Sequence, residues 1–260
     1  MMKKIGVFTV LLSFGLGLTS WHPRHFHFAD GKIKTLVIDA GHGGKDPGAH
    51  GDETWEKNVT LAIALELKMM LKEQHPELKI IMTRENDKFI ELHNRAKTAY
   101  GNNADFFISI HCNANTSKVP FGSESYVMGL HKEGANLDLI MNENKSILME
   151  DNYEKEYEGF DPSKPETYIL FSLIKNGFLK QSISLAKKCE SHFVANGKSS
   201  RGVKQAGFLV LWKAATPSIL IETGFISNKD DEKFLNSEAG RKSIATSVFK
   251  AIGDYNKEME

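Results

Sequence analysis

The chain has 260 residues and 41% of them are hydrophobic, which is enough for one large domain with a substantial core. Lys plus Arg and Asp plus Glu both number 33, so the chain lacks the positive charge with which proteins hold nucleic acids or anionic membranes. Its two cysteines, Cys112 and Cys189, form neither a disulfide framework nor a zinc-finger pattern. Composition therefore argues against a nucleic-acid partner and predicts a single domain.

The first twenty residues have the pattern of an export signal. Two lysines precede an uncharged apolar stretch at 5–18. A stretch of this length is typical of a signal peptide, whereas a membrane span needs roughly 20 apolar residues. We therefore predict a signal peptide at 1–20, cleaved near Ser20, and an N-terminal arm at 21–32. The mature protein is expected in the periplasm or outside the cell envelope, with an uncleaved anchor as the alternative.

Hydrophobic periodicity divides the rest of the chain into alternating strands and helices. A buried strand is predicted at 35–40 and an amphipathic helix at 56–72. Further strands are predicted at 78–83, 105–110, 123–128, 207–211 and 218–221, and further helices at 89–100, 131–150, 163–196 and 244–255. This order predicts an α/β single domain at 33–257, with a mixed, mostly parallel twisted sheet of about six strands, helices on both faces and a helical insert.

Polar side chains stand at the ends of three predicted strands. His42 follows the first strand within a run of glycines, His111 follows the third, and Glu222 follows the last. Ligands bind outside the carboxyl ends of strands in open α/β sheets, so we expect these side chains to converge, together with Glu56 at the start of its helix. Two histidines and one carboxylate are the ligand set of a catalytic zinc, which leaves Glu222 as an acid or base.

Five motifs occur in one order along residues 33–256. They are Ile38-Asp-Ala-Gly-His42-Gly-Gly-Lys-Asp-Pro-Gly-Ala49, Glu56-Lys57, Met82-Thr-Arg84 with Asp87, Ser109-Ile-His111-Cys-Asn113, and Pro217 through Asn228. With them the chain resembles the zinc-dependent N-acetylmuramoyl-L-alanine amidases (amidase type 3), which cut stem peptides from peptidoglycan. The family usually has Pro where Ala40 stands and Ala where Cys112 stands, and neither position carries a ligand.

The resemblance implies a function and a site. His42, Glu56 and His111 would hold one Zn²⁺ per chain, and Glu222 would be the catalytic glutamate. The enzyme would hydrolyse the amide bond between N-acetylmuramic acid and L-alanine, for cell-wall remodelling or daughter-cell separation. Peptidoglycan would be its partner, and we expect a monomer.

Two further residues and two other functions stay open. Arg84 and Asn113 are candidates to bind substrate or to support a metal ligand, and a structural salt bridge is the alternative for Arg84. A zinc peptidase acting within the stem peptide would use similar chemistry. A catalytically inactive peptidoglycan-binding module would be expected to lack a ligand or the catalytic acid, and all four residues are present.

The segment 131–180 is an insert that a minimal amidase of this type does not need. Some family members concerned with daughter-cell separation have a helix here that covers the zinc until an activator protein displaces it. The acids Glu143, Glu150 and Asp151 are candidates to reach the metal from such a regulatory lid. A simpler interpretation is that the insert forms a wall of the substrate groove.

Overall fold

The computed structural model describes residues 32–129, 137–164, 167–168 and 177–260. The predicted signal peptide and nearly all of the predicted arm lie outside these ranges, as do two parts of the insert. Within these ranges, no helix has both the length and the apolar character required to cross a membrane.

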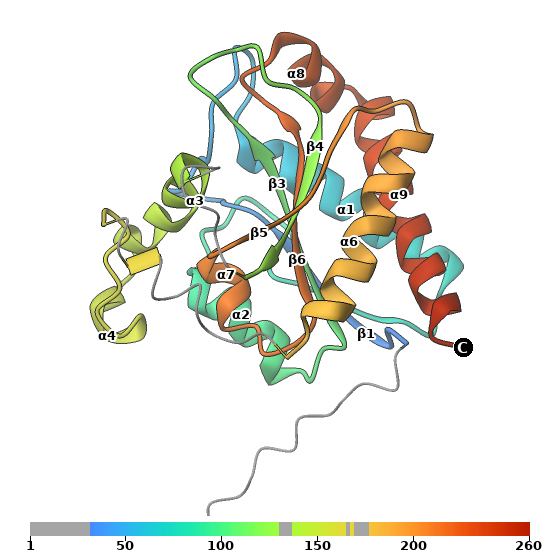
Figure 1. Cartoon of the computed structure of the whole chain (residues 1–260), viewed down its shortest axis with the longest axis horizontal. Helices are drawn as coiled ribbons and strands as arrows, with labels where there is room; N and C mark the ends of the chain where they lie inside the picture. Colours follow the sequence, from blue (N-terminus) through green and yellow to red (C-terminus); the bar gives the residue numbers. More distant parts are fainter. Residues whose placement is uncertain (1–31, 130–136, 165–166, 169–176) are drawn as a thin grey trace, which may run out of the picture.

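A six-stranded sheet forms the centre of the domain (Figure 1). Across the sheet the strands are β2 (Lys79–Met82), β1 (Thr35–Ala40), β3 (Phe106–Asn113), β6 (Ser218–Phe225), β4 (Ser123–Met128) and β5 (Ser200–Ala206). Strands β4 and β6 are antiparallel, and every other neighbouring pair is parallel. The prediction of an α/β domain with a mixed, mostly parallel sheet of about six strands is confirmed.

Helices cover both faces of the sheet. On one face lie α1 (Glu56–Gln74), α6 (Leu179–Ala195) and α9 (Glu238–Glu258), with α9 packed against both of the others. On the other face lie α2 (Leu92–Gly101), α7 (Leu209–Trp212) and the insert, which contains α3 (Leu137–Asn144), the 3-10 helix η1 (Lys145–Met149) and α4 (Tyr153–Glu156). The short α8 (Lys229–Asn236) follows β6.

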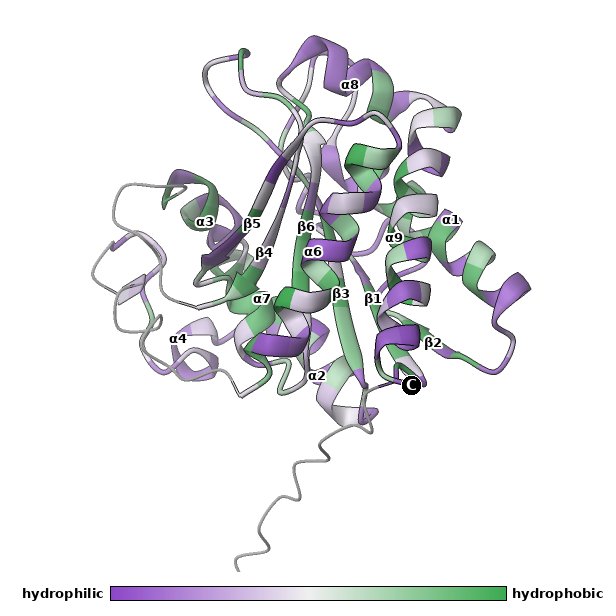
Figure 2. Cartoon of the chain, turned by 45° about the vertical axis from the view of Figure 1, so that its right-hand side comes forward, coloured by the Kyte–Doolittle hydropathy of each residue, from purple (hydrophilic) through white to green (hydrophobic). Residues whose placement is uncertain are grey.

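Strand β3 shows how the two cores are built. Phe106, Ile108 and Ile110 face the α1, α6 and α9 side, while Phe107 faces the insert side. Successive side chains of a strand point to opposite faces, so a strand covered on both faces is apolar throughout its length. In Figure 2 the central strands are accordingly hydrophobic, whereas the edge strand β5 is largely hydrophilic.

The structure corrects several predicted boundaries. The strand predicted at 207–211 is wrong, because this apolar run forms the short buried helix α7 and the strand lies just before it, at β5. The helix predicted at 131–150 ends at Asn144 and continues as η1. Of the helix predicted at 163–196, residues 165–166 and 169–176 lie outside the described residues, and the described helix is α6. Strands β3 and β6 are longer than predicted, so His111 and Glu222 lie within strands rather than after them.

Candidate metal centre

Register and strand ends bring the four predicted residues to one rim of the sheet. His111 of β3 is the direct partner of Glu222 in β6, and parallel partners project to the same face. His42 comes two residues after β1, and Glu56 is the first residue of α1. All four side chains are buried.

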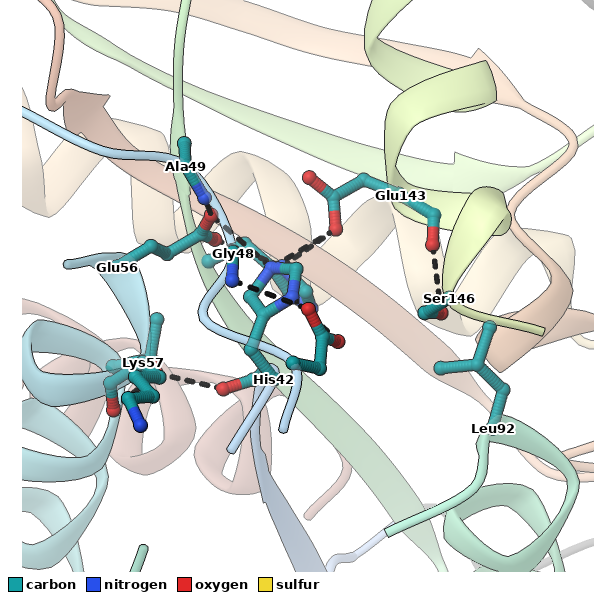
Figure 3. A network of polar contacts seen from close by, with 12 residues as sticks. His42, Gly48, Ala49, Glu56, Lys57, Leu92, Glu143 and Ser146 are labelled. Carbon is teal, nitrogen blue, oxygen red and sulfur yellow. Dashed lines mark hydrogen bonds and ion pairs between the residues drawn. The ribbon is translucent and has the colours of Figure 1, made fainter. Parts of the chain in front are cut away.

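Four side chains converge closely enough to hold one ion. The His42 Nε2 atom lies 3.1 Å from Glu56 Oε2, and His111 Nδ1 lies 3.1 Å from Glu56 Oε1. Glu143 reaches in from α3, with Oε2 3.3 Å from His42 Nε2 and 3.0 Å from His111 Nδ1 (Figure 3). One ligand atom from each of these residues lies within 4.8 Å of the others.

Two glycines allow this approach. A β-carbon on Gly41 would lie 2.5 Å from His111 Cε1, and a β-carbon on Gly48 would lie 2.6 Å from His42 Cδ2 and 2.7 Å from a Glu56 oxygen. Any side chain at either position would therefore displace a candidate ligand. His42 itself has φ of 60°, a left-handed conformation that costs a non-glycine residue energy and is enriched at functional sites.

Asp46 orients the ring of His42. Its Oδ2 lies 2.9 Å from His42 Nδ1, which directs Nε2 into the cluster. A carboxylate on the second nitrogen is the usual support of a metal-binding histidine, because it fixes the tautomer and the ring plane. Sequence reasoning assigned no role to Asp46, although it stands four residues after His42 within the same glycine-rich motif.

Arg84 holds the backbone of this loop. The buried guanidinium donates to the carbonyl oxygens of Ala40 at 2.9 Å and Gly41 at 2.6 Å. It also donates to the Lys57 carbonyl oxygen at 2.8 Å, so most of its hydrogen bonds among the described residues are to backbone oxygens of the site and of α1. Arg95 adds a third support, because its Nη2 donates to the His42 carbonyl oxygen at 2.7 Å.

Burial and the neighbouring charges set the protonation of the cluster. Burial alone would lower the pKa of His111, but the carboxylates of Glu143 and Glu56 outweigh it and raise this pKa to about 10. The pKa of His42 is raised well above its usual value in the same way, by Glu56 and Glu143 against burial. The carboxylates therefore keep positive charge at this position, as protons on the rings or as a metal ion.

The donor set and its spacing fit zinc. Zinc bonds to nitrogen and oxygen of about 2.0–2.1 Å in a tetrahedron place the ligand atoms roughly 3.3 Å apart. The distances of 3.0–3.3 Å between the ring nitrogens and the carboxylate oxygens agree with this spacing. Although carboxylate oxygens lie 3.1 and 3.3 Å from the buried His42 Nε2, among the described residues none of them makes a hydrogen bond of acceptable geometry with it, as expected of an atom placed for a metal.

Glu222 differs from the other acids at the rim. It is fully buried, and within the described part of the chain neither of its oxygens has a hydrogen-bond partner. Burial, followed by the charge of Glu143, raises the pKa of this carboxyl well above its usual value. A carboxyl of raised pKa beside a candidate metal site is suited to take up and release a proton during a reaction.

The remaining predicted residues lie at different places. Asn113 Nδ2 donates to Glu124 Oε1 at 2.5 Å, next to the cluster on β3. Glu150 lies away from the ligand atoms at the start of α2, where its carboxylate accepts hydrogen bonds from the Leu92 backbone at 2.6 Å and the Tyr157 hydroxyl at 2.8 Å. Asp151 is exposed in the next turn. Of the three candidate acids of the insert, only Glu143 is among the clustered groups.

Comparison with known proteins agrees with this geometry. The sequence profile of the family described as N-acetylmuramoyl-L-alanine amidase matches residues 36–254. The chain is 32% identical over 249 residues to N-acetylmuramoyl-L-alanine amidase AmiA of Escherichia coli (strain K12), which covers 92% of this chain and 82% of that protein.

Two solved structures share the fold. The N-acetylmuramoyl-L-alanine amidase from Clostridium difficile 630 is similar with a TM-score of 0.64 and 24% identity, over 87% of this chain and 98% of that one. The CwlD amidase from Clostridioides difficile, solved in complex with the GerS lipoprotein, is similar with a TM-score of 0.63 and 25% identity, over 86% of this chain and 99% of that one. Since the matched segment contains the whole sheet and all four rim residues, the chain belongs to the N-acetylmuramoyl-L-alanine amidase family.

Proposed function

We propose that this protein is a zinc-dependent amidase that hydrolyses the bond between the lactyl carbonyl of N-acetylmuramic acid and the amino nitrogen of L-alanine in peptidoglycan. The observation that carries the proposal is the cluster of His42, Glu56 and His111 beside a buried carboxyl, Glu222, with no hydrogen-bond partner among the described residues. Membership of the amidase family supports the reaction and the substrate.

The residues divide the chemistry among them. His42, Glu56 and His111 would hold the ion, and Asp46 would keep the His42 ring in place. A zinc ion bound there supplies a Lewis acid that polarises the amide carbonyl and makes water acidic enough to attack at neutral pH. Glu222 would accept the proton of the attacking water on its carboxylate and then pass it to the departing nitrogen of alanine, because an amine must be protonated to leave.

Digestion of purified cell wall tests this proposal. Wild-type protein is incubated with wall, with and without a chelator, and the products are identified by mass spectrometry. Glycan strands bearing muramic acid without peptide, together with intact stem peptides, are expected only when metal is present. Shortened stem peptides would indicate a peptidase instead. No soluble product from the Glu143→Ala variant, in which the insert no longer reaches His42 and His111, would support a binding module.

We also propose that the insert restrains the enzyme, with Glu143 in the position that water must occupy. Its contacts to His42 and His111, at 3.3 and 3.0 Å, support this role. The helix that carries it is anchored at its end, where the Asn144 side chain donates to the Gly207 carbonyl oxygen at 3.0 Å and accepts from the Leu209 amide at 3.0 Å.

Export and control by a partner complete the proposal. The predicted signal peptide and a peptidoglycan substrate both favour a location outside the cytoplasm, where the enzyme would act in wall remodelling or daughter-cell separation. A protein activator that docks on the insert 131–180 would displace Glu143. The CwlD structure, solved with a lipoprotein, makes a protein partner reasonable for a relative of this size.

A further inference from the structure

We propose that Arg201 and Lys204 form a subsite for a carboxylate on the leaving peptide, at its second residue, and so set the stem-peptide preference of the enzyme. This inference rests on the proposed amidase activity and adds the substrate feature that the site would recognise. Both cations stand on β5, an edge strand that sequence reasoning did not identify.

A bulge in β5 directs Arg201 toward the catalytic face. Ser123 pairs with Ser200, and Ser125 pairs with Val203, so two residues of β5, Arg201 and the one after it, stand opposite a single residue of β4. The second bulged residue is a glycine with φ of 81°, a backbone conformation that glycine adopts at little cost. Bulges of this kind redirect side chains next to active sites.

The residue opposite the bulge, Glu124, connects both cations to the catalytic acid. In the antiparallel pairing of β4 with β6, Glu124 is the direct partner of Glu222, so their side chains share a face. Arg201 Nε donates to Glu124 Oε2 at 3.0 Å, and Lys204 Nζ contacts the same oxygen. The other oxygen of this buried carboxylate accepts from Asn113 at 2.5 Å and from the Tyr126 hydroxyl at 2.9 Å.

The balance of charge leaves this position able to bind an anion. One buried carboxylate faces two cations, whose side chains are 40% and 26% exposed for Arg201 and Lys204. The Arg201 guanidinium lies 5.2 Å from the centre of the Phe225 ring, which limits its movement. Among the described residues only its Nε is engaged in a hydrogen bond, so its two terminal NH₂ groups can bind a carboxylate as a fork.

The spacing matches the second residue of the leaving peptide. Neighbouring strands lie about 4.8 Å apart, so β5, two strands from β6, places the Arg201 backbone roughly 10 Å from that of Glu222. An extended peptide advances about 3.5 Å per residue, which carries a carboxylate on the second residue roughly 7 Å beyond the scissile nitrogen. The long side chain of Arg201 can cover the remaining distance between its backbone and that carboxylate.

Kinetics with two matched substrates test the inference. The substrates are muramoyl dipeptides that bear either a free carboxylate or a carboxamide on the second residue. The reference is the full-length, zinc-loaded protein with Glu143→Ala, so that restraint by the insert does not interfere. We expect KM to be about tenfold lower for the free carboxylate, as one partly exposed charge-assisted bond provides, with similar kcat for the two substrates.

Four variants of the reference protein identify the source of this preference. Arg201→Gln with Lys204→Gln is expected to remove it by raising KM for the free carboxylate alone, while Arg201→Lys retains part of it. In the double variant the buried Glu124 carboxylate has lost both cations, which could unfold the protein. Adding Glu124→Gln removes this unpaired charge, so that the loss of the preference can also be measured in a triple variant without it. Lys257→Gln removes one exposed charge from the end of α9 and should change nothing.

Three outcomes would overturn the inference. Equal KM for both substrates in the reference protein would contradict it while leaving the amidase activity established. An equal loss on both substrates in the Arg201 and Lys204 variants would assign these residues a structural role. If the zinc-loaded reference protein cleaves neither substrate, the proposed function fails, and the inference that rests on it fails too.

Discussion

Replacement of Glu143 by alanine is expected to activate the enzyme. In the structure its Oε2 atom lies 3.3 Å from His42 Nε2 and 3.0 Å from His111 Nδ1, and in the proposed mechanism it would keep out the attacking water. A point substitution is preferable to deletion of the insert, because Ile140 and Ile147 of the insert are fully buried in the core that also contains Phe107.

The size of the gain follows from the contact that is lost. A hydrogen bond to a charged group contributes about 1.5–3 kcal/mol net, and Glu143 is only 11% exposed, so little of this is lost to solvent. At about 1.4 kcal/mol for each tenfold change, removing the contact should raise the fraction of open sites, and with it kcat/KM, by roughly 10- to 100-fold. Zinc should stay bound, because His42, Glu56 and His111 are unchanged.

Release of dye-labelled fragments from purified cell wall measures this gain, and metal analysis of the same sample gives the zinc content. Asp138→Asn is the matched control, because it removes one acidic charge from an exposed position on the same helix, α3. An unchanged rate in Glu143→Ala at full zinc occupancy would refute the lid and favour the groove-wall interpretation. Equal gains in both variants would attribute the effect to the charge of the helix instead.

The remaining predictions concern the catalytic acid, the support of one ligand and the buried acid of β1. Glu222→Gln should keep zinc and lose about 10²- to 10⁴-fold in kcat, the usual contribution of general acid-base catalysis; an active variant at equal zinc content would exclude this role. Asp46→Ala should weaken zinc binding about 10- to 100-fold, measured by competition with a chelator, because His42 loses the partner 2.9 Å away; unchanged affinity would show that other contacts fix the ring. Burial alone would raise the pKa of Asp39, but Arg95 at 2.8 Å and hydrogen bonds from Ser109 and Thr83 hold this pKa below its usual 3.8. Ionised Asp39 therefore stabilises the fold above pH 3.8, and this stabilisation is lost as the pH falls through the lowered pKa. Asp39→Asn should therefore lower the free energy of unfolding at pH 7 by about 3–5 kcal/mol, measured as a lower melting temperature. The difference in free energy of unfolding from wild type should narrow below pH 3.8, and a constant difference would contradict the assignment.

The sequence predicted the elements whose patterns are local. The strand that leads to His42 is apolar on both faces and ends in glycines, and both features are visible without the fold. Strand β5 was missed because it lies at the edge of the sheet, where Ser-Arg-Gly-Val-Lys-Gln needs little apolar character. The buried run that follows it was taken for the strand, since short apolar runs do not distinguish strand from helix.

The candidate site was predicted to a similar extent. Strand ends identified His42, His111 and Glu222 as neighbours, because all carboxyl ends of parallel strands meet at one rim. Which acid of the insert reaches the candidate metal site depends on where α3 ends and on how it is rotated against the sheet, and neither can be derived from the local sequence pattern. The position of Arg201 could not be predicted either, because the bulge in β5 changes the face to which its side chain points and the sequence pattern does not reveal the bulge.

The packing of the insert has a consequence for how such an enzyme could be switched on. The proposed lid is not a flap lying on the surface, because Ile140, Ile147 and Tyr157 are completely shielded from water. Lifting it would expose apolar area at about 25 cal/mol for each Å², a cost that thermal motion seldom meets. An activator would then have to offer an apolar surface of its own to replace the one uncovered. The rate of hydrolysis would then rise with the concentration of the activator until the enzyme is saturated. A cell could keep a large amount of enzyme at the cell wall without the wall being cut.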